Sequence, residues 1–219
     1  MAERRVLNKD EQNIRTGLQE LGEMVQSAIE NVCHALATLD TTLCEAIVAN
    51  DKSINAQQYK IEQECLTTIA TQQPVATDLR VLVAAMFISV ELERIADHVS
   101  GIAKTTIKLA SETPVTNVEA VLAMANACKE MLQQAVQAYL AYDAEQAFTI
   151  AAKDREIDDL QTRISTDIIN QMCENAQRVP FGSGLLWIVH ALERIGDRAT
   201  NICEQIVYIK KSEILDLNS

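Results

Sequence analysis

The sequence predicts an all-α protein, built as a tandem pair of antiparallel three-helix bundles with six long helices. Gly (6) and Pro (3) are scarce among 219 residues, whereas Ala, Leu, Ile, Glu and Gln, which lose little side-chain freedom in a helix, are plentiful. Apolar residues recur at intervals of three and four, and no strand-like alternation competes with them. The second half of the sequence also repeats the pattern of the first half.

The repeat is clearest in the phrase LERIADH at residues 92–98, which returns as LERIGDR at residues 192–198. At a slightly larger offset, Asp51 matches Asp154. A short deletion between the two stretches explains the difference in offset, so we interpret the chain as a tandem duplication. We predict two repeats, residues 1–113 and 114–219.

In the first repeat, Asp40 and Pro74 separate three predicted helices. Asp40 has the side chain of an N-cap, and Pro74 cannot donate the backbone hydrogen bond that would continue a helix. The first helix carries an apolar stripe over residues 14–39. The second is expected to end near Gln72, and the third to span about residues 77–110.

The second repeat copies this order. An apolar stripe over residues 118–139 predicts the fourth helix, and Asp143 is the expected N-cap of the fifth, whose inward stripe spans residues 157–172. The phrase RVPFGSG at residues 178–184 contains Pro and two Gly, so we predict a non-helical break there. The last helix carries a stripe over residues 185–209. Short connections make sequential helices antiparallel neighbours.

Two acidic pairs lie on the repeated helices. Glu93 and Asp97 are four apart and therefore share a helical face, and Glu193 and Asp197 repeat the arrangement. At about 100° per residue, both pairs point away from the apolar stripe of their own helix, which predicts a surface site. Like charges at this spacing destabilise a helix by a few tenths of a kcal/mol, and a bound cation would offset that cost.

The preceding helix of each repeat supplies partners for these acids. In the first repeat they are Asp51 and Asn55, which hairpin geometry places at the height of the acidic pair. In the second they are Asp154 and Asp158, whose height agrees only if residues 178–184 are not helical. Carboxylate and amide oxygens suit hard or borderline cations such as Mg, Mn, Ca or Fe. Each repeat thus has three or four candidate oxygen ligands.

An ordinary solvated helix face is the alternative interpretation of these acids, with Arg94 and Arg194 as weak surface ion-pair partners. No Glu-x-x-His is present, which disfavours a ferritin-like di-iron core. No nucleophile elbow, Gly-rich phosphate loop or Cys/His cluster is present, so we expect no enzyme activity. Phe181 and Trp187 are expected in the core.

Charge and hydropathy exclude several classes of partner. The net charge of −12 opposes binding to nucleic acid or to an anionic membrane surface. The longest apolar run, residues 81–90, is about half as long as a membrane span requires. The first residues contain no apolar region typical of a secretory signal. We therefore expect a cytoplasmic protein that does not insert into the membrane.

Together these motifs resemble the PhoU family, the accessory and regulatory proteins of bacterial phosphate-specific transport. The resemblance covers essentially the whole chain and rests on the duplicated LERI(A/G)D context of the acidic pairs. It also rests on DLR at residues 78–80 after Pro74, on Asp51 and Asp154, and on DRATNICE at residues 197–204. It implies two three-helix bundles that carry multinuclear metal clusters on their surface.

The resemblance implies metal sites in both repeats, with Fe, Zn, Mn or Mg as the metal. The candidate ligands are Glu93, Asp97, Asp51 and Asn55 in the first repeat, and Glu193, Asp197, Asn201, Asp154 and Asp158 in the second. Gly101 stands where the second repeat has Asn201, and it supplies no side-chain oxygen. Asn55 likewise stands where the second repeat has Asp158. We therefore expect the first site to be the weaker one.

The resemblance further implies a cytoplasmic, often dimeric regulator that damps phosphate-starvation signalling. Such a protein links the ATPase subunit of the phosphate ABC transporter to a membrane sensor histidine kinase, so both are expected partners, together with a second copy of the chain. Two alternatives stay open: a helical protein of metal storage or homeostasis, and a plain helical interaction scaffold without metal.

Overall fold

The structure is a computed structural model that describes residues 2–112 and 118–218. Within these ranges the regular elements are all helices, which confirms the all-α fold class. The helices are α1 (Ala2–Thr38), α2 (Thr41–Gln72), α3 (Thr77–Leu109), α4 (Val118–Ala141), α5 (Ala144–Ala151), α6 (Asp154–Glu174), the short 3₁₀ helix η1 (Ala176–Arg178) and α7 (Val179–Lys211). None of the described helices is long and apolar enough to cross a membrane.

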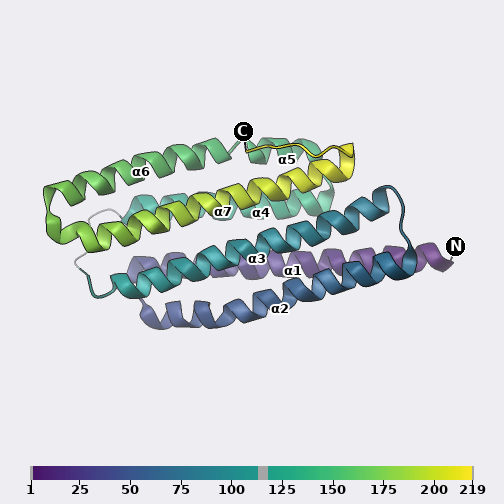
Figure 1. Cartoon of the computed structure of the whole chain (residues 1–219), viewed down its shortest axis with the longest axis horizontal. Coiled ribbons are helices and arrows are strands. Elements are labelled where there is room, and N and C mark those ends of the chain that lie inside the picture. Colours follow the sequence, from purple (N-terminus) through teal and green to yellow (C-terminus); the bar gives the residue numbers. More distant parts are fainter. Residues whose placement is uncertain (1, 113–117, 219) are drawn as a thin grey trace.

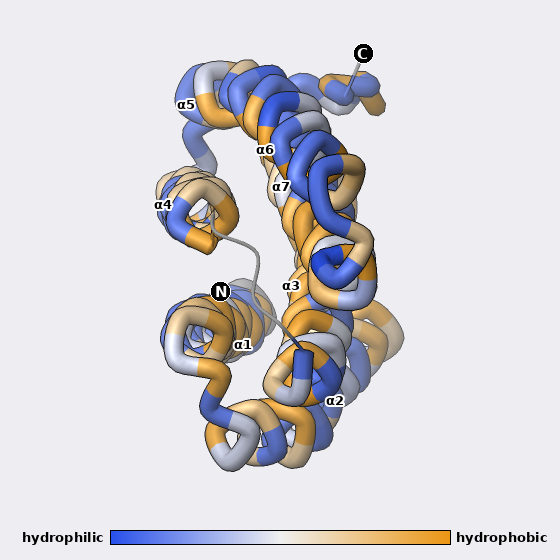
Figure 2. The backbone as a smooth tube through the Cα atoms, turned by 90° about the vertical axis from the view of Figure 1, so that its left-hand side faces the viewer, coloured by the Kyte–Doolittle hydropathy of each residue, from blue (hydrophilic) through white to orange (hydrophobic). Residues whose placement is uncertain are grey.

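The long helices lie in two layers. In Figure 1, α2, α3, α7 and α6 lie side by side nearer the viewer, with α1 and α4 behind them. The end view in Figure 2 shows the same division, with α1 and α4 on one side. Helices α1–α3 form one antiparallel three-helix unit and α4–α7 form the other, as the duplication predicts. The predicted boundary between residues 113 and 114 lies outside the described residues.

Helices α3 and α7 join the two units and run antiparallel. Near one end of the contact, Arg80 Nε donates to the backbone oxygen of Ile209, at 3.3 Å. Nearer its middle, Arg198 Nη1 lies 3.3 Å from Glu91 Oε2. Residue numbers therefore rise along α3 as they fall along α7. The two copies of the LERI phrase lie beside each other near the centre of the molecule. One hydrophobic core runs through both repeats.

The predicted N-caps form in both repeats. The side chain of Asp40 accepts a hydrogen bond from the backbone N–H of Leu43, at 3.0 Å, at the start of α2. Asp143 accepts from the N–H of Gln146, at 2.9 Å, at the start of α5. Each bond satisfies an N–H group that has no partner within its own helix. The equivalent caps confirm that the chain enters the second helix of each repeat in the same way.

The predicted break at residues 178–184 is wrong, because most of that phrase lies inside α7. Pro180 occupies the first turn, where a helix does not need the missing N–H and the fixed φ of proline is favourable. The chain instead breaks at Asn175, whose side chain accepts a hydrogen bond from the backbone N–H of Gln177, at 3.0 Å.

Two further expectations differ from the structure. The fifth predicted helix is divided, because α5 ends at Ala151 and α6 starts at Asp154. Phe181 lies in the core as expected, but Trp187 is 44% exposed. The indole of Trp187 lies against Gly101 of α3, and the helical period alone does not reveal which neighbour covers that side of α7.

Candidate functional site

The first acidic cluster consists of Asp51 on α2 and of Glu93 and Asp97 on α3. The three carboxylates are close enough to repel one another. Burial raises the pKa of Asp51, and the charge of Asp97 raises it further. Burial also raises the pKa of Glu93, with contributions from Asp97 and Asp51. Asn55 lies one turn beyond Asp51, and its buried Oδ1 makes no hydrogen bond. The structure therefore brings together acids that the hairpin geometry predicted.

The second acidic cluster consists of Asp154 and Asp158 on α6 and of Glu193 and Asp197 on α7. Asp154 is only 7% exposed, and its Oδ1 makes no hydrogen bond. Burial raises the pKa of Asp154 to about 6, and the charges of Asp197, Asp158 and Glu193 add to the effect. The buried Oε2 of Glu193 also makes no hydrogen bond. This cluster thus contains a buried carboxyl group whose ionisation is costly without a cation.

The division between α5 and α6 sets the position of Asp154. Asp154 is the first residue of α6 and faces Gly196 on α7. A Cβ at position 196 would lie 3.0 Å from Asp154 Oδ1 and 3.0 Å from Ile157 Cδ1. The first repeat has Ala96 at the matching position. The glycine in LERIGDR therefore permits a close approach of α6 to α7 at the second acidic cluster.

Positive side chains neutralise only part of the second acidic cluster. Arg194 forms an ion pair with Asp197. His190 Nδ1 lies 3.3 Å from Glu193 Oε2, a pair that is charged only when the imidazole is protonated. Arg94 does not repeat the arrangement of Arg194, because it pairs with Glu91 at 3.3 Å. The alternative interpretation, in which the arginines pair with the acidic residues of the clusters, therefore holds for Arg194 and not for Arg94.

Asn201 is engaged outside the second acidic cluster in this structure. Its Nδ2 donates to Glu91 Oε2 across the α3–α7 contact, at 3.1 Å. Its Oδ1 accepts from the side chain of Asn218, at 2.9 Å. Ligation of a metal by Asn201 stays a prediction, and it requires the amide to leave at least one of these partners.

Glu91 is a polar residue at the centre of the molecule that the sequence did not identify. It is 9% exposed and accepts hydrogen bonds from Arg94, Arg198 and Asn201. The matching residue of the second repeat is Ala191. The sequence signal for Glu91 is its position directly after the apolar run 81–90 and next to a core leucine. A carboxylate buried at such a position requires hydrogen-bonding partners.

The donor set fits an oxygen-preferring cation, although the side chains do not converge on one point as they stand. No group of three or more His, Cys, Asp or Glu within the described ranges is positioned to hold a metal. Asp154 Oδ1, Glu193 Oε2 and Asn55 Oδ1 are nevertheless buried without hydrogen bonds, and buried polar atoms normally have partners. A cation in the second repeat would give Asp154 and Glu193 a partner, and a separate cation in the first repeat would give Asn55 one, after rotation of the side chains.

Comparisons with known proteins agree on one family. The model of the PhoU domain matches this chain twice, at residues 18–106 and 121–206. The phosphate-specific transport system accessory protein PhoU homolog of Streptococcus pneumoniae serotype 4 is 35% identical over 198 residues, which is 90% of this chain and 92% of the relative. PhoU of Escherichia coli K12 is 28% identical over 94% of this chain and 86% of its own length.

Solved structures share the fold over nearly the full length. The crystal structure of the phosphate transport system regulatory protein PhoU from Streptococcus pneumoniae superposes with a TM-score of 0.90 at 31% identity, covering 96% of this chain and 99% of that chain. PhoU from Pseudomonas aeruginosa gives a TM-score of 0.89 at 29% identity over 94% of this chain. With the duplicated helical unit and its paired acidic motifs, these matches show that the chain belongs to the PhoU family.

Proposed function

We propose that this protein is a non-enzymatic regulator of phosphate uptake that represses phosphate-starvation signalling in the cytoplasm. The observation that carries the proposal is the pair of acidic clusters at equivalent positions of the two repeats. The relatives named as accessory or regulatory proteins of phosphate transport support the biological setting. The buried, unbonded oxygen of Asp154 supports a cation site within it.

The proposed role of the clusters is to hold cations at the junctions of α2 with α3 and of α6 with α7. A bound cation would supply positive charge where the chain has several carboxylates. The side chains that would hold it are Asp51, Asn55, Glu93 and Asp97 in the first repeat, and Asp154, Asp158, Glu193, Asp197 and Asn201 in the second. Fe, Zn, Mn and Mg are the candidate metals. The chain's own side chains would fix the spacing of the helices that carry them.

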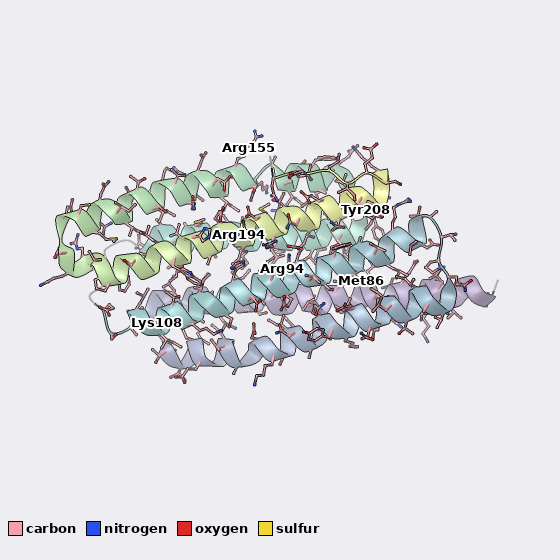
Figure 3. All side chains as sticks on the ribbon, viewed as in Figure 1. Met86, Arg94, Lys108, Arg155, Arg194 and Tyr208 are labelled. Atoms are coloured by element: carbon pink, nitrogen blue, oxygen red, sulfur yellow. The ribbon has the colours of Figure 1, made fainter. Side chains whose placement is uncertain are left out.

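Two partly exposed arginines lie in the region between the clusters, with side chains that are 50% exposed at Arg94 and 37% exposed at Arg194. Arg94 and Arg194, which adjoin Glu93 and Glu193 in sequence, lie on neighbouring helices in the layer nearer the viewer (Figure 3). We propose that partners of phosphate transport contact this layer. These partners are the ATPase subunit of the phosphate ABC transporter and a sensor histidine kinase, and a second copy of the chain would form a homodimer.

The function is tested by co-purification and by gene deletion. The protein is expected to bind the purified transporter ATPase subunit or the cytoplasmic part of the sensor kinase. Deletion is expected to switch on phosphate-starvation genes in phosphate-rich medium. Failure to bind either partner, together with normal phosphate-dependent gene expression after deletion, would contradict the proposal.

Metal storage is the second candidate function, and the acidic clusters favour it over a plain scaffold. Elemental analysis of the purified protein separates the two metal roles. Metal at the stoichiometry of the two clusters fits a structural or signalling site, whereas loading far above the number of ligands fits storage. For a scaffold without metal, Glu193→Ala with Asp197→Ala would leave function unchanged and raise stability slightly, because it removes like-charge repulsion.

A further inference from the structure

The segment after α7 folds back over the second repeat. Ser212, with φ of 60°, ends α7 and turns the chain. Figure 1 shows the segment running back beside α5 toward the start of α6. Leu215 and Leu217 pack against the hydrophobic core. Residues 213–218, which we name the C-terminal strap, therefore lie on the same end of α6 as the second acidic cluster.

Two hydrogen bonds to α7 hold the C-terminal strap in place. The backbone N–H of Leu217 donates to Glu204 Oε1, at 2.8 Å. The side-chain Nδ2 of Asn218 donates to Asn201 Oδ1, at 2.9 Å. Burial raises the pKa of Glu204 and the N–H of Leu217 lowers it, which shows that the bond to the strap favours the charged carboxylate.

The strap also forms a wall of the cavity next to the second acidic cluster. This cavity of about 320 Å³ is lined by Asp154, Arg155 and Asp158 of α6, by the end of α5 and by Leu217 and Asn218 of the strap. The nearly buried Asp154 has an oxygen without a hydrogen bond. The strap thus lines the same cavity as the buried carboxyl group of Asp154.

The first acidic cluster has no such cover among the described residues. The cavity beside Asp51 has a volume of about 730 Å³, and all of its lining residues come from α1, α2 and α3. The position of Asn201 is taken by Gly101 in the first repeat, so the hydrogen bond from Asn218 has no counterpart there. The two clusters therefore differ in access as well as in ligands.

We propose that the C-terminal strap competes with cation binding at the second acidic cluster, and that a cation bound there releases the strap. This inference rests on the cation-binding part of the proposed function. Asn201 Oδ1 cannot coordinate a cation fully while it accepts from Asn218, and Leu217 covers part of the entry. Because linkage is reciprocal, a strap that weakens cation binding is itself weakened by the cation to the same extent.

The test is a calorimetric titration with Mn²⁺ alone as the probe. The background variant Glu93→Gln with Asp97→Asn disables the first cluster, so that the heat reports the second. Within it, a chain that ends at Ser212 is expected to bind Mn²⁺ about fivefold more tightly, and Asn218→Ala about twofold more tightly, the scale of one net hydrogen bond or less. Asn8→Ala, an exposed asparagine at the other end of the sequence, is the matched control.

The reverse background, Glu193→Gln with Asp197→Asn, reports the first cluster. There the shortened chain is expected to bind Mn²⁺ with the affinity of the full chain. Thermal melting checks that the shortened chain is folded, and Asn218→Ala keeps the test valid if it is not. Equal Mn²⁺ affinity at the second cluster with and without the strap, or no Mn²⁺ binding there in either chain, overturns the inference.

Hydrogen exchange gives a second readout, with no need to change the strap. The amide of Leu217 is protected by Glu204 in the structure, and Mn²⁺ is expected to increase its exchange in the full chain. Unchanged protection at saturating Mn²⁺ contradicts release. Phosphate regulation is judged separately by the deletion experiment, so a strap without effect on Mn²⁺ leaves that part of the proposed function standing.

Discussion

The indole of Trp187 lies directly over Gly101, and a Cβ at position 101 would come within 2.5 Å of Trp187 Cη2. The glycine is therefore a packing requirement of the α3–α7 contact. In the second repeat the equivalent position holds Asn201, which binds Glu91 instead. The duplicated helices have thus diverged at one pair of positions into an aromatic contact on one side and a hydrogen bond on the other.

Gly101→Ala is expected to displace the indole. Because Trp187 is the sole tryptophan and is partly exposed, its fluorescence emission should shift to longer wavelength as the ring moves toward solvent. The better helix propensity of alanine, about 1 kcal/mol, should offset much of the packing cost. Gly17→Ala on α1 is the control and should leave the emission unchanged. An unshifted spectrum in Gly101→Ala would contradict the close approach.

Asp154→Asn is expected to stabilise the metal-free protein at neutral pH. The folded-state pKa of about 6 lies above the ordinary value of 3.8, so the stability contributed by this carboxyl is complete below pH 4 and declines as the pH rises to 6. The stability of Asp154→Asn does not decline in this way over the same pH range, because the asparagine side chain does not titrate. In chelator, its free energy of unfolding should exceed that of the wild type by at most about 3 kcal/mol at pH 7.5 and by only about 0.5 kcal/mol at pH 4.

Denaturant titrations at the two pH values measure this difference. The exposed Asp159→Asn on the same helix is the control, and it should change stability by less than about 0.5 kcal/mol at either pH. If Asp154→Asn is less stable than the wild type at pH 7.5, the carboxylate has a favourable partner that the structure does not contain.

Gly196→Ala should disturb the second acidic cluster and destabilise the protein, although alanine has the better helix propensity. The added methyl group would meet Asp154 Oδ1 and Ile157 Cδ1, each at 3.0 Å, so α6 must shift by a few tenths of an ångström. We expect a net destabilisation of about 1 kcal/mol, from overpacking partly offset by propensity. NMR should show chemical-shift changes at Asp154. The reciprocal variant Ala96→Gly should also destabilise, by about 1 kcal/mol, but without effect on Asp154.

Glu91 and Arg198 should show energetic coupling in a double-mutant cycle. Glu91 is nearly buried and lies 3.3 Å from Arg198, so removing either partner leaves the other poorly solvated. We expect a coupling of about 1–2 kcal/mol in alanine variants. The exposed pair of Lys60 and Glu64, 4.0 Å apart, should couple by less than about 0.5 kcal/mol. Equal coupling in the two pairs would remove the distinction between them.

The helices were predictable because their signals are local. The apolar period and the N-caps Asp40 and Asp143 follow from a few neighbouring residues, and the structure confirms them. The break was misplaced because Pro180 can either end a helix or begin one. Asn175, which holds the actual turn with its side chain, carried a weaker signal.

The first acidic cluster was predictable because helical spacing and a short hairpin together fix which residues face each other. The second forms although the condition predicted for it, a non-helical segment at 178–184, is not met, because α6 ends at Glu174 and the chain turns at Asn175 instead. The environment of those residues was not predictable from spacing. Asn201 has the right interval for a ligand, yet Glu91 and Asn218 bind it. Both partners come from other elements, α3 and the C-terminal strap, whose positions depend on tertiary packing.

The most direct test of the central claim, that the acidic clusters control phosphate signalling, uses a phosphate-starvation reporter. In cells that lack the chromosomal copy, the wild-type gene should restore repression in phosphate-rich medium. A variant carrying Glu93→Gln, Asp97→Asn, Glu193→Gln and Asp197→Asn, expressed at the same level and folded, should leave the reporter switched on. Full repression by this variant would contradict the account.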